Sequence, residues 1–426
     1  MPEDLSPVQA TWRSPEAPAI QMQRLWDRHM ALATFGALDQ GGVNRPAFSP
    51  IDAQARLRVI DWGARIGLLA SLDSIGNLFL RRPGTRPELA PVFTGSHLDT
   101  QPTGGKFDGA YGVLAGLEML ETFHDAGCET LRDIVLVIWA NEEGSRFAPT
   151  TMGSSVFAAS LSLAQALQAQ DEHGERLSEV LPTFLDAHGP LPVALDLIPF
   201  AYVEAHIEQG PVLEAEQRAL GIVTGIQGLR WFEIEVCGQE AHAGTTPKAA
   251  RADALHTAVN LAHALFEYFD GIGDEVRFTI GRWRTEPGSP NTVPGRVKFT
   301  IDLRHQKAES LAAFSQAIED RCQAYRGVCE VTIAQLSESP PIEFSESVQH
   351  LLDQSAQVWG VPRMVLISGA THDAKWLNAM TPSGMLFVPC EHGISHNQRE
   401  NTKREDLAAG AQVLAESILR LARQAN

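Results

Sequence analysis

Residues 95–109, Gly-Ser-His-Leu-Asp-Thr-Gln-Pro-Thr-Gly-Gly-Lys-Phe-Asp-Gly, are the stretch that decides the fold expected of this chain. They follow an apolar run at 91–94 that is typical of a buried strand. His97 and Asp99 are two residues apart, so their side chains leave one face of an extended segment. Asp108 follows a glycine-rich turn and precedes a helix-like run. A neutral imidazole, a carboxylate that orients it and a second carboxylate are what a hydrolytic metal site requires.

The first half of the chain alternates strand-like and helix-like runs, which favours an α/β fold with a mainly parallel sheet between layers of helices. The expected strands are 92–94, 134–140 and 201–207, and the expected helices are 56–64, 111–123 and 156–170. Residues 171–199 are predicted to form a further amphipathic helix with loops.

A different pattern begins near residue 223. Alternating strands at 232–236, 276–280, 297–303 and 329–336 are interrupted by helices at 249–268 and 309–325. This β-α-β-β-α-β order is that of a ferredoxin-like sandwich. We therefore predict a catalytic domain formed by 1–222 and 339–426, with a module inserted at 223–338.

The chain is expected to resume after the module with a helix at 347–359 and a strand at 384–389. The last helix is predicted to start at a capping box made by Thr402 and Glu405.

Composition excludes several classes of protein. The 426 residues carry 34 Lys and Arg against 52 Asp and Glu, a net charge of −18, which argues against a nucleic-acid partner. No apolar run reaches membrane-spanning length, and the acidic first six residues do not resemble a secretory leader. The five cysteines are odd in number and form no Cys-x-x-Cys pair, which favours free thiols in the cytoplasm.

Three further segments carry groups of the type that bind metals. Glu142 and Glu143 follow the strand at 134–140 and point to opposite sides, so one is able to bind a metal while the other remains a base. The alternative is a solvated acidic loop. One face of the next strand carries Glu204, His206 and Glu208. These ionisable groups either serve a functional site or lie on a polar face in water.

His396 follows the strand at 384–389 and would lie in the loop at its carboxyl end. Sites of open α/β sheets gather at that edge, and His97, Asp108 and Glu143 are also expected there. One histidine at a strand end is weak evidence, whereas this set of residues at one edge predicts a metal site.

The chain resembles a known group of enzymes. It is similar to the two-metal amidohydrolase and exopeptidase superfamily that includes aminoacylase and carboxypeptidase G. Within it, the chain most resembles the N-carbamoyl-L-amino acid hydrolase and allantoate amidohydrolase (hydantoinase/carbamoylase) branch. The matching segments run through most of the chain in family order: GSHLDTQPTGGKFDG (95–109), ANEEGSRF (140–147), EAHIEQGPVL (204–213), GQEAHAGTTP (238–247), NTVPGRVKFTIDLRH (291–305) and GISHN (393–397).

The resemblance implies a role for each residue of the site. His97 and His206 would each bind one metal ion, Glu143 and His396 would bind the other, and Asp108 would bridge the pair. Asp99 would hold the tautomer of His97, and Glu142 would be the general base. The resemblance implies two divalent ions per subunit, and the nitrogen and oxygen donors suit Zn²⁺, Mn²⁺, Co²⁺ or Ni²⁺ alike.

The resemblance also implies residues that contact substrate. His242 would reach the active site of a partner subunit in a homodimer and stabilise an oxyanion, which makes the inserted module a lid and dimerisation domain. Asn291 and Arg304 would hold the substrate carboxylate, although a surface Arg–Asp pair is the alternative for Arg304. Gly369 precedes His372-Asp373 in a loop expected near the substrate.

Leu229 stands where allantoate amidohydrolases usually have a Gln. Because a leucine donates no hydrogen bond to a ureido group, we expect hydrolysis of the carbamoyl C–N bond of N-carbamoyl-L-amino acids. Allantoate amidohydrolase, β-ureidopropionase and dipeptidase activities remain the alternatives, and a non-catalytic binding protein is a further one.

Overall fold

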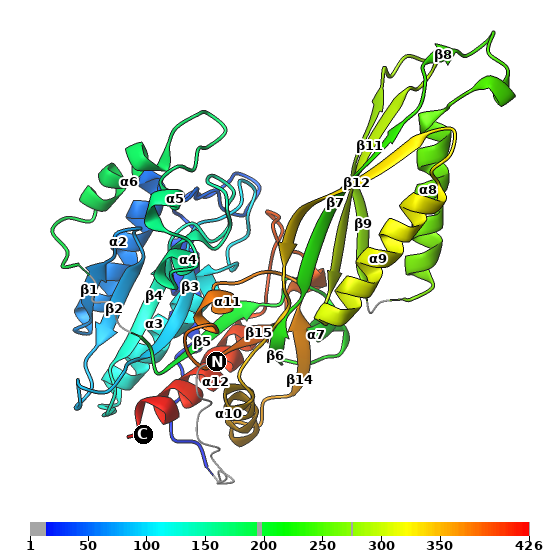
Figure 1. Ribbon diagram of the computed structural model, residues 1–426. Coiled ribbons are helices and arrows are strands. Elements are labelled where there is room, and N and C mark those ends of the chain that lie inside the picture. The colour runs from blue at the N-terminus through cyan, green and yellow to red at the C-terminus, as the bar shows by residue number, and fades with distance from the viewer. Residues whose placement is uncertain (1–13, 194–197, 274–275, 426) are drawn as a thin grey trace. The chain divides into compact units, whose positions relative to one another are not determined.

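The computed structural model describes residues 14–193, 198–273 and 276–425 (Figure 1). These residues form two compact units, one made of Met1–Thr224 with Phe344–Asn426 and the other of Gly225–Glu343. The first six residues, on which the expectation of no leader rests, lie outside the described part. The assignment of catalytic and lid roles to 1–222 with 339–426 and to 223–338 stays a prediction.

The first unit is built on a nine-stranded sheet. Its central strands β4, β3, β5 and β15 are parallel to one another, and the flanking pairs β1–β2, β2–β4, β15–β6 and β6–β13 are antiparallel. The order along the sheet is β1 (Leu69–Leu72), β2 (Leu78–Arg82), β4 (Ile134–Trp139), β3 (Val92–His97), β5 (Ala201–Ile207), β15 (Ser383–Val388), β6 (Leu220–Ile226) and β13 (Ile342–Glu343), with β14 (Arg363–Ser368) pairing with β6.

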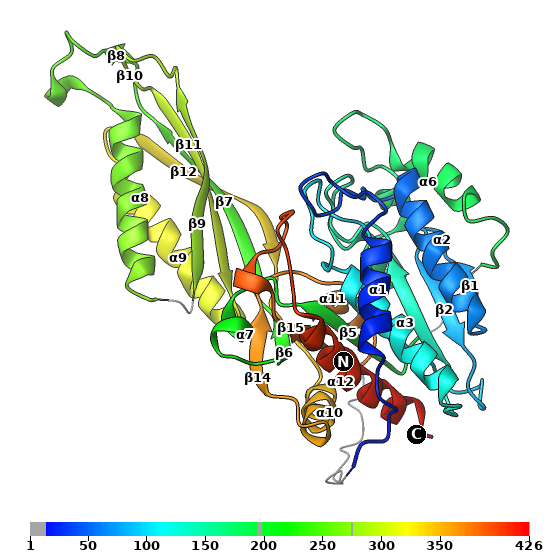
Figure 2. The same cartoon turned by 180° about the vertical axis from the view of Figure 1, so that it is seen from behind.

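Both faces of this sheet are covered, and every residue of the central strands β3, β4, β5 and β15 is buried. On one face, Val92 and its neighbours belong to a large core shared with α3 (Ala110–Asp125), α10 (Glu346–Val358) and α12 (Arg404–Ala422) (Figures 1 and 2). On the other face, Phe93 packs against Phe157 of α4 (Met152–Phe157). The predicted three-layer α/β domain is confirmed.

Within the described ranges, six further helices complete this unit, and local sequence signals explain the start of α2 (Pro50–Arg65). Helix α2 begins with Pro50 at its first position, after Ser49, whose hydroxyl accepts the N–H of Asp52. The others are α1 (Met22–Leu32), α5 (Leu163–Ala166), α6 (Leu177–Asp186), α7 (Val212–Ala215) and α11 (Ala374–Leu377), with a 3₁₀ turn η2 at Glu391–Gly393.

Two helix predictions are wrong in this unit. The helix expected over 156–170 is broken, because Ala159 adopts a left-handed φ of 55° and Ser162 starts a new capping box with Gln165. The capping box expected at Thr402 and Glu405 does not form. The Thr402 hydroxyl instead donates to the carbonyl of Pro389 (2.6 Å), and α12 starts after Lys403 without a side-chain cap.

The second unit has the predicted ferredoxin-like topology. Its antiparallel sheet has the order β12 (Glu330–Ser339), β7 (Gly228–Cys237), β11 (Arg296–His305) and β9 (Arg277–Glu286), with α8 (Ala254–Asp270) and α9 (Ala308–Ala324) on one face (Figure 1). Phe232, Ile234 and Val236 of β7 and the odd residues of β11 are buried under these helices. A small ribbon of β8 (Ala241–His242) and β10 (Thr292–Val293) and a 3₁₀ turn η1 (Lys248–Ala250) complete the unit.

The helix predicted over 249–268 starts too early. Asp253 accepts the N–H of His256 and sets the first turn of α8 at Ala254, so the preceding residues form η1 and a loop.

All five cysteines are free thiols in the structure. Among the described residues, no helix is both long enough and apolar enough to span a bilayer.

Helix α2 carries two Asp–Arg pairs at i,i+4, one buried and one exposed. Arg56 and Asp52 are completely buried, with Nε 2.9 Å from Oδ1, and Arg56 also donates to the carbonyls of Gly76 and Trp139. Arg65 and Asp61 lie in water, with side chains 66% and 51% exposed.

We expect Arg56→Ala to destabilise the protein by about 3–5 kcal/mol, because it leaves a buried carboxylate unpaired. Arg65→Ala is the matched control and is expected to cost about 0–1 kcal/mol. Urea unfolding followed by circular dichroism measures both. Equal midpoints for the two variants would contradict the importance of the buried pair.

Candidate metal centre

Five residues predicted as metal ligands come together at one edge of the large sheet. His97 ends β3, Glu143 follows β4, and His206 lies near the end of β5. His396 lies in the loop after β15, and Asp108 lies in the loop before α3. Parallel strands bring their carboxyl ends to the same edge, which is why residues distant in sequence meet here.

The five residues form two groups that share Asp108. His97, Asp108 and His206 make one group, and Asp108, Glu143 and His396 make the other, each with ligand atoms within 4.8 Å of one another. Asp108 Oδ1 lies 4.0 Å from His97 Nε2 and 3.3 Å from His206 Nε2, whereas Oδ2 lies 3.3 Å from His396 Nε2. His396 Nε2 is in turn 3.4 Å from Glu143 Oε2.

Main-chain carbonyls set the orientation of two of these rings. His97 Nδ1 lies 2.9 Å from the carbonyl of Asp99, and His206 Nδ1 lies 2.9 Å from the carbonyl of Ile207. A carbonyl only accepts, so each Nδ1 carries the proton and each Nε2 presents a lone pair to the centre. Gly109, at φ 64°, gives the ring of His97 its space, because a Cβ there would overlap the imidazole.

Asp99 contacts the site differently from what a simple His–Asp pair suggests. Its carboxylate lies 3.8 Å from His97 Nδ1 and accepts the main-chain N–H groups of Glu142 (3.2 Å) and Glu143 (3.1 Å). The carbonyl of Asp99 therefore orients the imidazole, and its carboxylate holds the turn that carries the two glutamates.

The two glutamates point to different partners. Glu143 Oε2 accepts a hydrogen bond from Gln101 Nε2 at 2.7 Å and faces His396. Glu142 Oε2 lies 3.6 Å from His97 Nε2, and Glu142 belongs to neither group. Glu143 is thus part of a group of possible metal ligands, whereas its neighbour Glu142 lies beside the groups without belonging to either.

The electrostatics of the centre fit divalent cations. Burial, reinforced by the charge of Asp108, raises the pKa of Glu143 to about 8, and burial with nearby carboxylates raises the pKa of Glu142 well above its usual value. Burial lowers the pKa of His97 to about 4, which keeps this imidazole neutral. Buried carboxylates that lack enough positive charge, together with imidazole nitrogens, form a nitrogen and oxygen donor set suited to Zn²⁺, Mn²⁺, Co²⁺ or Ni²⁺.

Asp108 is the exception among these carboxylates. Burial raises its pKa, but the hydrogen bond from His396 and the electrostatic interactions with the neighbouring imidazoles outweigh burial and hold the pKa below its usual value. The hydrogen bond to Asp108 in turn raises the pKa of His396 to about 9.

Three residues of this region were not predicted from the sequence as site residues. His372 packs its ring 4.5 Å from that of His206 and joins it and Glu204 in a third group of possible ligands. Gln209 Nε2 donates to Asp108 Oδ2 at 3.0 Å, and Glu400 accepts the main-chain N–H of Asp108 at 3.1 Å. Their nearness in sequence to His206 and His396 was the available signal for Gln209 and Glu400.

Glu208, expected on the same face as His206, is not part of these groups. Its carboxylate accepts the N–H groups of Val212 (2.8 Å) and Leu213 (2.9 Å) and so caps α7.

The residues predicted to contact substrate lie mostly in the second unit. His242 is exposed, and its Nδ1 accepts the N–H groups of Gly244 (3.0 Å) and Thr245 (3.2 Å), so Nε2 carries its proton outward. Asn291 lies beside it, because its carbonyl accepts the N–H of Ala243 at 3.0 Å.

Leu229 and Arg304 face each other across β7 and β11 on the sheet face that the helices leave open. Arg304 forms an ion pair with Asp302 (2.9 Å), the surface pair that was the alternative for this residue. Gly369 lies in the first unit, exposed in the loop after β14.

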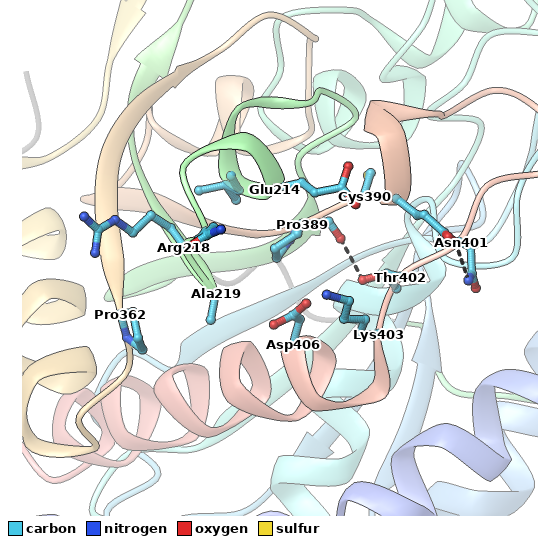
Figure 3. A pocket seen from close by; sticks show the side chains of 13 residues that line it. Glu214, Arg218, Ala219, Pro362, Pro389, Cys390, Asn401, Thr402, Lys403 and Asp406 are labelled. Carbon is cyan, nitrogen blue, oxygen red and sulfur yellow. Dashed lines mark hydrogen bonds between the residues drawn. The ribbon is translucent and has the colours of Figure 1, made fainter.

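A cavity of about 480 Å³ lies elsewhere on the first unit, between α7 and the start of α12 (Figure 3). Its walls include Cys390, Lys403 and Asp406, and none of the five residues of the two groups lines it. Cys390 Sγ accepts the N–H of Gln209 at 3.2 Å, which links the cavity wall to a residue that contacts Asp108.

Comparison with known proteins assigns the chain to a family. Residues 93–420 match peptidase family M20/M25/M40. The chain belongs to this family.

Several M20 relatives cover almost the whole chain. The N-carbamoyl-L-amino-acid amidohydrolase of Rhizobium meliloti is 38% identical over 413 residues, covering 95% of this chain and 97% of that protein. The allantoate amidohydrolase of Bacillus subtilis (strain 168) is 35% identical over 396 residues, covering 92% and 95%. The crystal structure of an amidase of the hydantoinase/carbamoylase family from Burkholderia multivorans has a TM-score of 0.90 at 40% identity, covering 95% and 99%.

Cation binding is expected to stabilise this M20 fold. After chelator treatment, Zn²⁺ or Mn²⁺ at 100 times its dissociation constant should add about 2.7 kcal/mol per bound ion to the free energy of unfolding and raise Tm. Asp108→Asn should abolish most of this rise, because both groups share Asp108. Glu208→Gln, which changes a nearby carboxylate outside the groups, is the control and should keep the rise. An unchanged rise in Asp108→Asn would refute the shared role.

Proposed function

We propose that this protein hydrolyses the carbamoyl C–N bond of N-carbamoyl-L-amino acids, giving the amino acid, CO₂ and ammonia. The observation that carries the proposal is Asp108, whose two oxygens face two separate groups of imidazole and carboxylate donors. The names of the relatives at 34–38% identity support the choice of substrate.

The donor sets are proposed to hold two divalent ions per subunit. His97 and His206 would hold one ion, Glu143 and His396 the other, and Asp108 both. When bound, such a pair would polarise the substrate carbonyl and lower the pKa of the attacking water.

Glu142 is proposed as the general base. Its carboxylate lies beside the first group without belonging to it, 3.6 Å from His97 Nε2. It would take a proton from the attacking water and deliver it to the nitrogen of the departing amino acid. Asp99 would keep Glu142 in place through the hydrogen bond to its main-chain N–H.

His242 is proposed to act on the centre of a partner subunit in a homodimer. Its Nδ1 is occupied by two main-chain N–H groups, so the remaining Nε2–H is a donor available for the oxyanion of the tetrahedral intermediate. The inserted module would accordingly serve as the lid and dimerisation domain.

Recognition of the substrate is proposed to involve Arg304 and Asn291 at the α-carboxylate, with Leu229 and Gly369 nearby. Arg304 already pairs with a carboxylate, that of Asp302, and a substrate carboxylate would compete for the same guanidinium. Leu229 lies opposite Arg304 and offers an apolar contact, which disfavours a second ureido arm.

Hydrolysis of allantoate is the second candidate, because an allantoate amidohydrolase is 35% identical to this chain. Leu229 argues against it. The free thiols of all five cysteines support a location in the cytoplasm.

A substrate panel tests the proposed function. We expect release of ammonia and amino acid from N-carbamoyl-L-amino acids, a lower kcat/KM for allantoate and dipeptides, and loss of activity in EDTA that Mn²⁺, Co²⁺ or Zn²⁺ restores. Glu142→Gln should bind as much metal as the wild type and lose turnover by about 10²–10⁴-fold.

Glu208→Gln is the matched control for the base and should remain active. Full activity in metal-free protein, or wild-type turnover in Glu142→Gln, would refute the mechanism. A higher kcat/KM for allantoate than for every N-carbamoyl amino acid would favour the second candidate.

Mixing two inactive variants tests the role of His242. If His242 acts across the dimer, exchange of subunits between Glu142→Gln and His242→Ala restores one intact site in each heterodimer, and about a quarter of wild-type activity returns for a two-fold dimer. If His242 serves its own subunit, every site in the mixture is defective and no activity returns.

A further inference from the structure

Glu400 joins the two loops that carry Asp108 and His396. Its side chain is buried, with the residue 4% exposed. Oε1 accepts the main-chain N–H groups of Phe107 (2.9 Å) and Asp108 (3.1 Å), and Oε2 accepts the hydroxyl of Ser395 (2.9 Å). One carboxylate therefore holds the backbone of Asp108 and the residue that precedes His396.

These contacts add to the hydrogen bonds between Glu391 and Asn401, which close the loop of His396 at its base. The His396 side chain is 49% exposed, and its backbone adopts a left-handed φ of 52°. A half-exposed side chain on a strained loop residue gains little orientation from packing. Ser395 also connects the two loops directly, because its hydroxyl lies 3.3 Å from Asp108 Oδ2.

The loop before Asp108 leaves space for this carboxylate. Gly105 lies directly against Glu400, and a Cβ at Gly105 would overlap Cδ and both carboxylate oxygens. The position of the Glu400 side chain therefore depends on having no side chain at Gly105, in the loop that Glu400 binds.

We propose that Glu400 is a positioning residue, which keeps Asp108 and His396 at the separation that a shared cation requires. Glu400 does not belong to either group of ligand atoms and acts through the main-chain N–H of Asp108 and the Ser395 hydroxyl. The inference rests on the proposed two-metal function.

Cation binding by the purified full-length protein tests the proposal, with Zn²⁺ in competition with a chelator and metal content measured by mass spectrometry. Glu400→Ala should weaken the ion held by Asp108, Glu143 and His396 by about 10–100-fold, the usual effect of losing a partner of a metal ligand. Glu400→Gln keeps one oxygen that accepts both main-chain N–H groups, and its amide N–H is able to donate to the Ser395 hydroxyl. The zinc affinity of this variant should therefore stay closer to that of the wild type.

Gly105→Ala provides an independent perturbation, because it displaces Glu400 without altering its chemistry. It should weaken the same ion, and adding it to Glu400→Ala should cause no further loss, since the space is then vacant. If Glu400→Ala does not fold by circular dichroism, Gly105→Ala and Glu400→Gln still carry the comparison.

Glu416→Ala is the matched control. Glu416 is fully buried, accepts main-chain N–H groups of Glu16 and Ala17, and belongs to none of the groups of possible ligands. It should lower Tm and leave both zinc affinities unchanged.

Equal weakening in Glu400→Ala and Glu400→Gln would show a pure charge effect and overturn the positioning role. Wild-type affinities in Glu400→Ala or Gly105→Ala would also overturn it. A wild type that binds fewer than two ions would instead count against the proposed function, so the two failures are distinguishable.

Discussion

The structure depends on keeping one buried carboxylate, that of Asp108, between two sets of partners. Asp108 is 4% exposed, and its oxygens face opposite sides of the centre. A carboxylate in this position is costly to bury unless positive charge is near it. The surrounding imidazoles reduce this cost, and divalent cations would remove more of it.

The central strands meet this requirement by geometry. Strands β3, β4, β5 and β15 run parallel and end at one edge, so each contributes a residue or a loop to the centre. Hydrogen bonds that involve the main chain then fix the site. Main-chain carbonyls orient the rings of His97 and His206. The carboxylates of Asp99 and Glu400 accept main-chain N–H groups and so hold the turns that carry Glu143 and Asp108. The orientation of the donors thus comes largely from hydrogen bonds to the backbone.

The sequence allowed the layers, the ferredoxin-like module and the meeting of the ligand-type residues to be predicted, because alternation and spacing report which face a side chain leaves. Local hydrogen bonds were harder to foresee. Thr402 binds the carbonyl of Pro389, which lies close only after β15 and α12 pack, so a local capping signal failed. Glu400 went unnoticed for a similar reason, since its partners Phe107 and Asp108 are almost three hundred residues away.

The most direct test of the central claim is anomalous diffraction from crystals of the protein grown with Zn²⁺ or Mn²⁺. The account predicts two peaks, one on each side of the Asp108 carboxylate, with His97 and His206 at the first and Glu143 and His396 at the second. A single peak bound by one group, or ions bound away from Asp108, would contradict it.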